Sequence, residues 1–308
     1  MDLIKENIIH KALQHGFSGV GFAKAERLEK AGDKLQEWLA EEKNGKMQYM
    51  ENHFEKRIDP RLLHPGTKTI ISLTYNYYQP EIENTDTKGK VSMYAYGTDY
   101  HHLIKDKIKL LVAELGEGIA DEIKVRYFTD SAPVMEREWA MRAGLGWIGK
   151  NTLLIHPKKG SYFFLAEILT DLEIETDDPI RDHCGTCTRC IDACPTQAIE
   201  AEGYRLDASR CISYLTIELK DPEIPAEFKG KMENWIFGCD ICQQVCPWNR
   251  FSNPTMEQEF FPEPLLGEMM ESNWENLSEP IFNELFDRSP VKRTGYENFI
   301  RNIEFIKG

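Results

Sequence analysis

All eight cysteines of the 308-residue chain lie between positions 184 and 246, and seven of them fall in two short runs. The runs are Cys184-x2-Cys187-x2-Cys190-x3-Cys194-Pro195 and Cys239-x2-Cys242-x3-Cys246-Pro247. This spacing is typical of ferredoxins with two iron–sulfur clusters, in which the cysteine before proline binds the opposite cluster. The second run is one cysteine short, and Cys211 is the remaining candidate. The sequence therefore predicts two 4Fe-4S clusters, whose eight ligands match the eight cysteines.

The crossing of the Cys-Pro cysteines divides the thiolates into two groups. One cluster takes Cys184, Cys187, Cys190 and Cys246, and the other takes Cys194, Cys211, Cys239 and Cys242. Disulfides and structural zinc are the alternatives. Disulfides need an oxidising compartment, and the first residues, MDLIKE, do not resemble an export signal. Zinc sites use two separated Cys-x2-4-Cys knuckles, which leaves the third and fourth cysteines of the first run unexplained.

Composition limits the classes of protein that the chain fits. Hydrophobic residues make up 41% of the sequence, enough for one large domain and a smaller one. No apolar stretch approaches the roughly 18 residues of a membrane span. The net charge of −14 repels polyanions, so any contact with nucleic acid must be local. We expect a soluble, cytoplasmic monomer that does not bind membranes.

Periodicity predicts an α/β (α+β) domain over residues 1–177, with helices at 2–15, 28–42 and 101–115 and strands at 69–75, 123–128, 152–155 and 162–169. Residues 178–250 contain short loops and the cysteines, and residues 251–308 form a tail that packs on the core. Asp130 follows the strand at 123–128, and ligands bind at strand ends in open α/β sheets. A helix is expected from Pro133 to Gly144. The sequence alone favours Asp130 as a helix N-cap.

The segment from Gly144 to Asn151, GLGWIGKN, matches a dinucleotide fingerprint and most of a phosphate-binding loop. Both motifs require a strand before the glycines and a helix after them. Here a helix precedes the glycines and an apolar strand, Thr152–Ile155, follows. We therefore do not expect nucleotide binding, and we interpret the glycines as a close-approach turn that lines the pocket of a large cofactor.

Several linked segments resemble the epoxyqueuosine reductase family, and together they cover nearly the whole chain. They are RIDPR (57–61), YAYGTDYH (94–101), DSAPVMER (130–137), AGLGWIGKNTLL (143–154), GCDICQ (238–243) and SPVKR (289–293), together with the cysteine runs. The chain resembles the short form of the family, which lacks C-terminal helical repeats.

The resemblance implies a cobalamin-dependent enzyme that reduces epoxyqueuosine to queuosine at the wobble position of tRNA with a GUN anticodon, the last step of queuosine biosynthesis. Residues 1–177 would form a nitroreductase-like cobalamin-binding domain, residues 178–250 a ferredoxin-like domain, and residues 251–308 a tail that contacts tRNA. A low-potential donor such as ferredoxin or flavodoxin would supply electrons. We expect tRNA to be held by the pocket rim and a small basic patch that includes Lys292, Arg293 and Arg301.

The resemblance also implies site residues. The family counterpart of Asp130 is the proton donor, and a buried carboxyl of this kind is expected to have a raised pKa. Residues in the matching motifs, or beside cluster cysteines, are expected to surround cobalamin: Arg57, Tyr96, Asp130, Lys150, Asn151, Leu154, Ser213, Asp240 and Gln243. The alternatives are that Arg57 pairs with Asp59 or Glu55 and that Tyr96 belongs to the core.

Two other functions are compatible with the cysteine pattern. A reductive dehalogenase shares cobalamin and two clusters, but such enzymes usually carry a twin-arginine export signal, which the N-terminus does not show. A plain iron–sulfur electron carrier would not need some 175 residues ahead of the cysteines. The reductase is therefore the favoured function.

Overall fold

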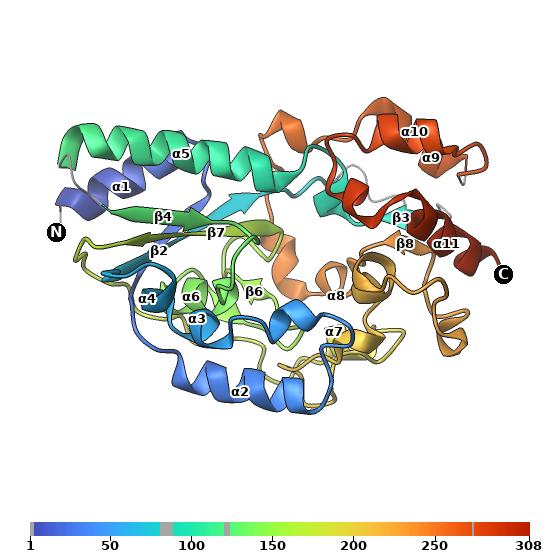
Figure 1. Cartoon of the computed structure of the whole chain (residues 1–308), viewed down its shortest axis with the longest axis horizontal. Coiled ribbons are helices and arrows are strands. Elements are labelled where there is room, and N and C mark those ends of the chain that lie inside the picture. Colours follow the sequence, from blue (N-terminus) through green and yellow to red (C-terminus); the bar gives the residue numbers. More distant parts are fainter. Residues whose placement is uncertain (1–2, 81–88, 120–123, 273) are drawn as a thin grey trace.

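A computed structural model describes residues 3–80, 89–119, 124–272 and 274–308 of the chain (Figure 1). Residues 2 and 123, expected to begin a helix and a strand, lie outside these ranges. The elements form a mixed α and β architecture around one four-stranded sheet, with two small two-stranded sheets beside it. The expected combination of helices and strands in the first 177 residues is therefore observed.

The central sheet has the order β1-β2-β7-β4. Its strands are β1 (Gly19–Lys24), β2 (Thr69–Asn76), β7 (Phe163–Thr170) and β4 (Val125–Phe128). Every neighbouring pair is antiparallel. The fold is thus α+β rather than an open parallel sheet, although Asp130 does follow the end of β4, as expected.

Helices cover both faces of this sheet (Figure 1). One face carries α1 (Leu3–Gln14) and α5 (Tyr100–Ile119), and the other carries α2 (Glu29–Ala40), α3 (Phe54–Ile58), α4 (Pro60–Leu63) and α6 (Glu136–Arg142). Alternate residues of a strand point to opposite faces. Accordingly, Phe22 and Ile71 pack into the core beside α1 and α5, whereas Ala23 and Ile70 pack with Trp139 of α6.

Small residues let α6 lie directly against the sheet. A Cβ atom on Gly21 would lie 2.0 Å from the carbonyl oxygen of Ala143, at the end of α6. Gly21 pairs with Ser72, and Ser72 pairs with Glu167 across β1, β2 and β7, so these three side-chain positions share one face. The residues at these three positions therefore determine how closely α6 packs on the middle of the sheet.

The glycine segment after α6 is a close-approach turn, as predicted. Gly144 has a φ of +72°, which suits the residue after a helix end. The strands β5 (Trp147–Ile148) and β6 (Leu154–Ile155) then pair, and a Cβ on Gly146 would lie 2.3 Å from the carbonyl oxygen of Ile155. The prediction that the helix begins at Pro133 was wrong, because α6 begins at Glu136 and Pro133 lies in the preceding loop.

The cysteine region consists of loops, with the short helices α7 (Arg189–Asp192) and α8 (Ile241–Gln244). Strand β8 (Trp235–Phe237) pairs in parallel with β3 (Lys90–Val91) and thereby joins this region to the first part of the chain. Helices α9 (Pro264–Glu271), α10 (Glu279–Leu285) and α11 (Tyr296–Lys307) lie at one end of the molecule (Figure 1).

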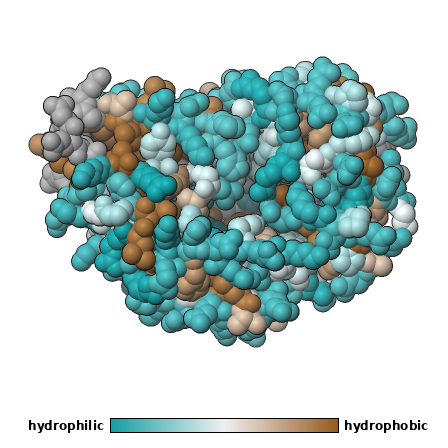
Figure 2. All heavy atoms as spheres, in the orientation of Figure 1, coloured by the Kyte–Doolittle hydropathy of each residue, from teal (hydrophilic) through white to brown (hydrophobic). Residues whose placement is uncertain are grey.

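The tail contributes to the main core rather than standing apart from it. Phe282, Phe286 and Phe299 are buried in the same apolar cluster as Phe22 and Ile71 of the sheet. The face drawn in Figure 2 is predominantly hydrophilic, with apolar residues in small groups. Among the described residues, no helix has the length and apolar character to span a membrane.

Candidate active site

The structure brings the first predicted group of cysteines together. All eight thiols are free and partly buried. Burial raises the pKa of Cys190 to about 11, and the nearby charges of Cys184 and Cys246 add to the effect. Burial also raises the pKa of Cys246, with further contributions from Cys184 and Cys187. Cys246 thus interacts with cysteines of the other run, which is compatible with the crossed assignment; the assignment itself stays a prediction.

Cysteines of the second predicted group also interact with one another, and burial acts strongly on two of them. Burial raises the pKa of Cys242 well above its usual value, and the charges of Cys211 and Asp240, followed by those of Cys190 and Cys194, raise it further, so Cys242 interacts with cysteines of both groups. Burial and the charges of Cys242 and Cys211 raise the pKa of Cys239. In the described part of the chain, no three His, Cys, Asp or Glu side chains are close enough together to bind a single metal ion. Each thiolate of a cubane binds a different iron, so the sulfurs stand farther apart than ligands of a single ion.

Lys150 and Trp147 contact the loop that carries the first group. The Lys150 ammonium donates to the carbonyl oxygens of Gly185 and Cys187, at 2.8 and 3.1 Å. The Trp147 indole N–H donates to the sulfur of Cys184 at 3.5 Å. Lys150, predicted from the family motif to contact cobalamin, thus uses its charged end to order the cysteine loop.

Asp130 lies in a recess of the protein. Its side chain is 64% exposed, although protein surrounds the carboxyl closely enough for burial to be the largest influence on its pKa. Its backbone is left-handed, with a φ of +47°, which is unusual for a residue other than glycine. The hydroxyl of Tyr100 donates to Oδ2 at 2.7 Å, and Nε2 of His101 lies 3.6 Å from the same oxygen. The Asp130 carboxyl is therefore open to solvent although protein atoms surround it, and we call this position the Asp130 recess.

His101 is the protonated member of this group. Its Nδ1 lies 2.6 Å from Oδ1 of Asp99, so the imidazole bridges two carboxylates. Burial lowers the pKa of His101, but its bonds to Asp130 and Asp99 outweigh burial and raise it to about 9. Burial raises the pKa of Asp130, yet the ion pair with His101 and the hydrogen bond from Tyr100 bring it below its usual value. The raised pKa was expected for a carboxyl buried against a corrin and apolar walls, so for the cofactor-bound state it stays a prediction.

Tyr100 and His101 were missed as functional residues in the sequence. They open α5, and Tyr100 stacks on Phe164 of the sheet with ring centroids 4.0 Å apart. The signal was present in the family segment 94–101, where His101 ends the YAYGTDYH motif. Nothing in the sequence showed that the start of α5 reaches the end of β4.

Tyr94 is a third residue that the sequence did not identify. Burial raises the pKa of Tyr94, and the charges of Arg293, Asp130 and Asp240 act on the same hydroxyl. Tyr94 belongs to the short helix η3 (Met93–Ala95) and is only partly buried. Tyr96, which was predicted to contact cobalamin, is 9% exposed and packs in the main core, the alternative that the sequence left open.

Arg57 fits the role of a ligand-binding residue better than the alternative of a surface ion pair. Asp59 pairs with Arg61 and Glu55 pairs with Arg27, so neither suggested carboxylate binds Arg57. One Arg57 nitrogen donates to the carbonyl oxygen of Tyr49 at 2.8 Å. Its Nε is buried and has no hydrogen-bond partner in the structure. A buried donor without an acceptor is what a polar ligand such as a corrin amide would satisfy.

The remaining predicted contacts lie around the second cysteine group. Asn151 donates to the carbonyl oxygen of Cys242 at 3.3 Å, and the hydroxyl of Ser213 hydrogen-bonds the sulfur of Cys211, which lowers the pKa of that thiol against the effect of burial. Leu154 is 3% exposed and packs against α6.

Asp240 and Gln243 connect the same region to the sheet domain. Asp240 Oδ2 accepts the backbone N–H of Met93 at 2.8 Å. The Gln243 amide donates to Tyr77 Oη at 3.3 Å and to the carbonyl oxygen of Ser161 at 3.1 Å. Asp240 therefore holds η3, which carries Tyr94, next to the enclosed cysteines.

The basic residues of the tail are largely engaged within the protein. Arg293, in η9 (Pro290–Thr294), pairs with Glu218 and acts on the pKa of Asp130. Lys292 pairs with Asp287. Arg301 donates to the carbonyl oxygens of Leu215 and Leu219. Of the three, Arg293 alone is placed at the Asp130 recess, so the expected patch is smaller than the sequence suggested.

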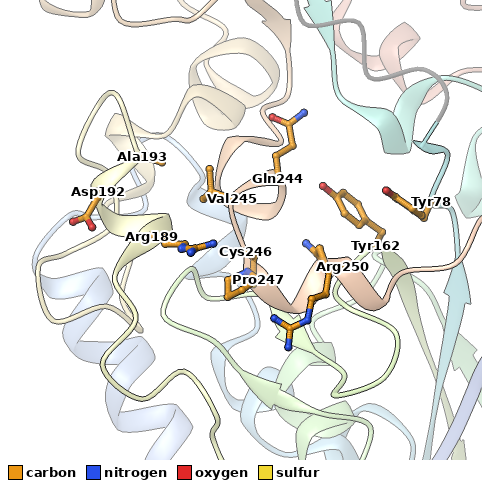
Figure 3. A pocket seen from close by; sticks show the side chains of 11 residues that line it. Tyr78, Tyr162, Arg189, Asp192, Ala193, Gln244, Val245, Cys246, Pro247 and Arg250 are labelled. Atoms are coloured by element: carbon orange, nitrogen blue, oxygen red, sulfur yellow. The ribbon is translucent and has the colours of Figure 1, made fainter.

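A separate hollow of about 810 Å³ lies beside the first cysteine group (Figure 3). Cys246 is part of its wall, together with Arg189 of α7 and Arg250. Both arginines are exposed, and neither forms an ion pair with any described carboxylate. Asp130 is not among its lining residues. Two arginines and one carboxylate, that of Asp192, thus line an opening next to one cysteine group, and this opening is separate from the Asp130 recess.

Two family models match the chain. Residues 57–131 match "Epoxyqueuosine reductase QueG, DUF1730", and residues 183–249 match "4Fe-4S double cluster binding domain". The first match includes Arg57, His101 and Asp130, and the second includes all eight cysteines. The cysteine region is therefore a 4Fe-4S cluster binding domain.

Curated relatives and solved structures agree with these matches. The epoxyqueuosine reductase of Cellulophaga algicola is 52% identical over 99% of this chain and 97% of its own, and that of Escherichia coli is 40% identical over 100% and 82%. A solved epoxyqueuosine reductase bound to an epoxyqueuosine-modified tRNA-Tyr stem loop is 32% identical over 98% of this chain and 80% of its own, with a TM-score of 0.88. The Bacillus subtilis enzyme, with its catalytic aspartate loop swung out of the active site, is 30% identical over the same shares, with a TM-score of 0.87. The chain belongs to the epoxyqueuosine reductase family.

Proposed function

We propose that this protein reduces epoxyqueuosine to queuosine in the anticodon loop of tRNA. The observation that carries the proposal is the accessible Asp130 carboxyl, held by Tyr100 and His101 in a recess of a chain that belongs to this family. The substrate class follows from the relative that binds an epoxyqueuosine-modified stem loop. The alternatives, a dehalogenase and a simple electron carrier, gain no support from any contact in the site.

The proposed cofactors are cobalamin and two 4Fe-4S clusters. Arg57, Asp130 and Asp240 would face cobalamin from residues 1–177 and 178–250, which we propose as its nitroreductase-like domain and the two-cluster ferredoxin-like domain. The orphaned Nε of Arg57 and the open Asp130 carboxyl support this placement. When bound, cobalamin supplies a strongly reducing, nucleophilic metal centre, and the clusters supply electrons at low potential.

The reaction sets the task of the protein residues. Conversion of the epoxide to an alkene consumes two electrons and two protons and releases water, so the site must deliver protons to the departing oxygen. His101 is protonated at neutral pH because its pKa is about 9, and its Nε2 lies 3.6 Å from Oδ2 of the ionised Asp130 carboxyl. We infer that Asp130 contacts the substrate oxygen and passes to it a proton that it takes from His101. General acid catalysis of this kind contributes about 10²–10⁴-fold to a rate.

We also propose that the hollow beside Cys246 receives the electron donor, an acidic one-electron carrier protein such as ferredoxin or flavodoxin. Arg189 and Arg250 offer positive charge on a chain whose net charge is −14, and Cys246 brings a cluster ligand to the wall (Figure 3). Complementary charge at such a surface mainly accelerates encounter. The donor would thus reach one cluster without entering the Asp130 recess.

Reversal of both charges tests this docking site. The double variant R189E/R250E should raise the KM for a reduced carrier protein at least tenfold, whereas turnover with a small chemical reductant should not change. K109E is the matched control, because it also reverses the charge of an exposed basic residue, on α5. It should alter neither the KM for the carrier nor the turnover with the chemical reductant. An unchanged KM for the carrier in the double variant would place the docking site elsewhere.

The overall function is tested with the purified protein, reconstituted anaerobically with iron, sulfide and cobalamin. A stem loop that contains epoxyqueuosine should be converted to the queuosine form, detected by mass analysis of its nucleosides. A strain that lacks the gene should accumulate epoxyqueuosine in its tRNA. Absence of cobalamin binding, or a strain with normal queuosine, would contradict the proposal.

A further inference from the structure

Two carboxyl groups, one on the sheet and one at the start of α6, interact with each other, and neither forms an ion pair with a cation of the described residues. Glu167 is in the middle of β7, and its side chain is 0% exposed. Neither of its oxygens has a hydrogen-bond donor in the structure. Glu136 is the first residue of α6, which lies over the same face of the sheet. A carboxylate buried in this way without a partner is costly, so the arrangement needs an explanation.

The explanation is that the two carboxyls share a proton. Two carboxylates cannot hydrogen-bond each other, whereas an acid and a carboxylate can. Burial and, after it, the charge of Asp130 raise the pKa of Glu136 to about 8. Burial and the charge of Glu136 raise the pKa of Glu167 well above its usual value. Arg137 and Asp130 are the other charged groups that act on Glu136, so the pair holds one proton at neutral pH.

Glu136 is also bonded to the loop that carries Asp130. Its Oε1 accepts the backbone N–H of Asp130 at 2.5 Å. This bond spans the loop between β4 and α6 and holds Asp130 in its left-handed conformation, with a φ of +47°. A left-handed aspartate persists only where surrounding contacts enforce it. In the Bacillus subtilis relative the catalytic aspartate loop has been seen swung out of the active site.

We propose that Glu136, oriented by the proton that it shares with Glu167, is a positioning residue that holds the Asp130 loop in the recess and releases it when that proton is lost. The inference rests on the proposed catalytic role of Asp130. With the proton present, Glu136 keeps one oxygen on the Asp130 amide and the other on Glu167. Without it, two adjacent buried negative charges repel each other, and Glu136 gives up the amide.

Amide hydrogen exchange of the loop peptide, residues 128–135, tests the proposal in the holoenzyme and does not depend on turnover. In the unaltered protein, protection should fall at least fivefold between pH 6.5 and pH 9 after correction for intrinsic exchange. E136A should lose the protection at both values. E167Q should keep it at both, because the amide of glutamine donates to Glu136 at any pH. E138Q, on the same helix, is the control, because Glu138 pairs with Arg142, and it should match the unaltered protein.

Kinetics separate positioning from a merely structural effect. E136A should lower kcat about tenfold or more at an unchanged KM for the stem loop, since the recess remains but Asp130 is no longer held. E136Q retains an acceptor for the Asp130 amide, so it should keep the loop protection at both pH values and its activity at neutral pH. Because glutamine preserves the shape of the side chain, E136Q still tests the proposal if E136A does not fold. Full protection in E136A, or the same pH dependence in E167Q as in the unaltered protein, would overturn the inference. Normal positioning in an enzyme that fails to convert the stem loop would instead overturn the proposed function.

Discussion

The chemistry at Asp130 depends on which residue carries the proton. The carboxyl is held by Tyr100 and His101, which lower its pKa against the effect of burial. The proton therefore resides on His101, whose second nitrogen contacts Asp99. Such a pair can act as an acid at neutral pH although its carboxyl is ionised. Replacement of Asp130 and replacement of His101 should therefore have different effects on turnover.

Replacement of Asp130 by asparagine should abolish turnover. Asparagine fills the same space and accepts from Tyr100, but it cannot transfer a proton. We expect kcat to fall at least about 10²-fold, the contribution of a general acid, while the visible spectra of the bound cofactors stay the same. Single-turnover assays with a modified stem loop provide the measurement. Retained activity in D130N would remove Asp130 from the mechanism.

Replacement of His101 by glutamine should remove an ionisation from the pH profile. Because the pKa of His101 is raised to about 9, its charge is present below that pH and is lost above it. In the E136Q background, where the Asp130 loop should stay in place at alkaline pH, activity should fall as the pH rises through about 9, and the double variant H101Q/E136Q should be slow at every pH with no such decline. H102Q is the control, since His102 is exposed on the next position of α5. If the alkaline loss of activity persisted after His101 is replaced, another group would be responsible for it.

At the scale of the elements, the site depends on how closely α6 approaches the sheet. Gly21, Ser72 and Glu167 occupy one row across three strands, and the end of α6 rests on Gly21. The start of the same helix carries Glu136, which is bonded to the Asp130 loop. Displacement of α6 should therefore lower the free energy of unfolding and also move the Asp130 loop.

The variant G21A should show this coupling. Its Cβ would lie 2.0 Å from the carbonyl oxygen of Ala143, so α6 must move away. Overpacking of this kind costs about 1–3 kcal/mol in the free energy of unfolding. G267A is the control, because nothing lies within 4 Å of that position in α9, and alanine there should add about 0.5–1 kcal/mol. Urea titrations measure the free energy of unfolding of both variants. If G21A left this free energy unchanged, the position of α6 would not depend on the contact with Gly21.

The sequence predicted elements better than their assembly. The strands at 69–75 and 162–169 and the reversed order around Gly144 were recognised because periodicity and glycine positions are local properties. The antiparallel order of the sheet was not, since strand pairing joins distant residues. For the same reason the sequence identified Asp130 by its motif but gave no indication of Glu167, which reaches the loop only through the register of β7.

At the scale of the whole molecule, two cysteine groups lie at different depths. Burial raises the pKa of Cys242 and Cys239 well above the usual thiol value, and it also raises that of Cys246, which lines an open hollow. Electrons would thus enter at the exposed group and leave from the enclosed group, which Asp240 connects to the η3 segment near Asp130. The order depends on the crossed assignment of the cysteines, because Cys190 and Cys194 are neighbours in one run but belong to different groups.

Paired cysteine exchanges test that assignment. C184S/C246S removes two ligands of one proposed cluster, taken from different runs, and should leave about four irons per chain. C190S/C194S removes one ligand from each cluster, although both cysteines lie in one run, and should leave little or no iron. Iron and acid-labile sulfide, measured after anaerobic reconstitution, distinguish the two results. If C190S/C194S kept four irons and C184S/C246S lost nearly all, each run would serve its own cluster, and the route from the hollow to the enclosed group would have to be redrawn.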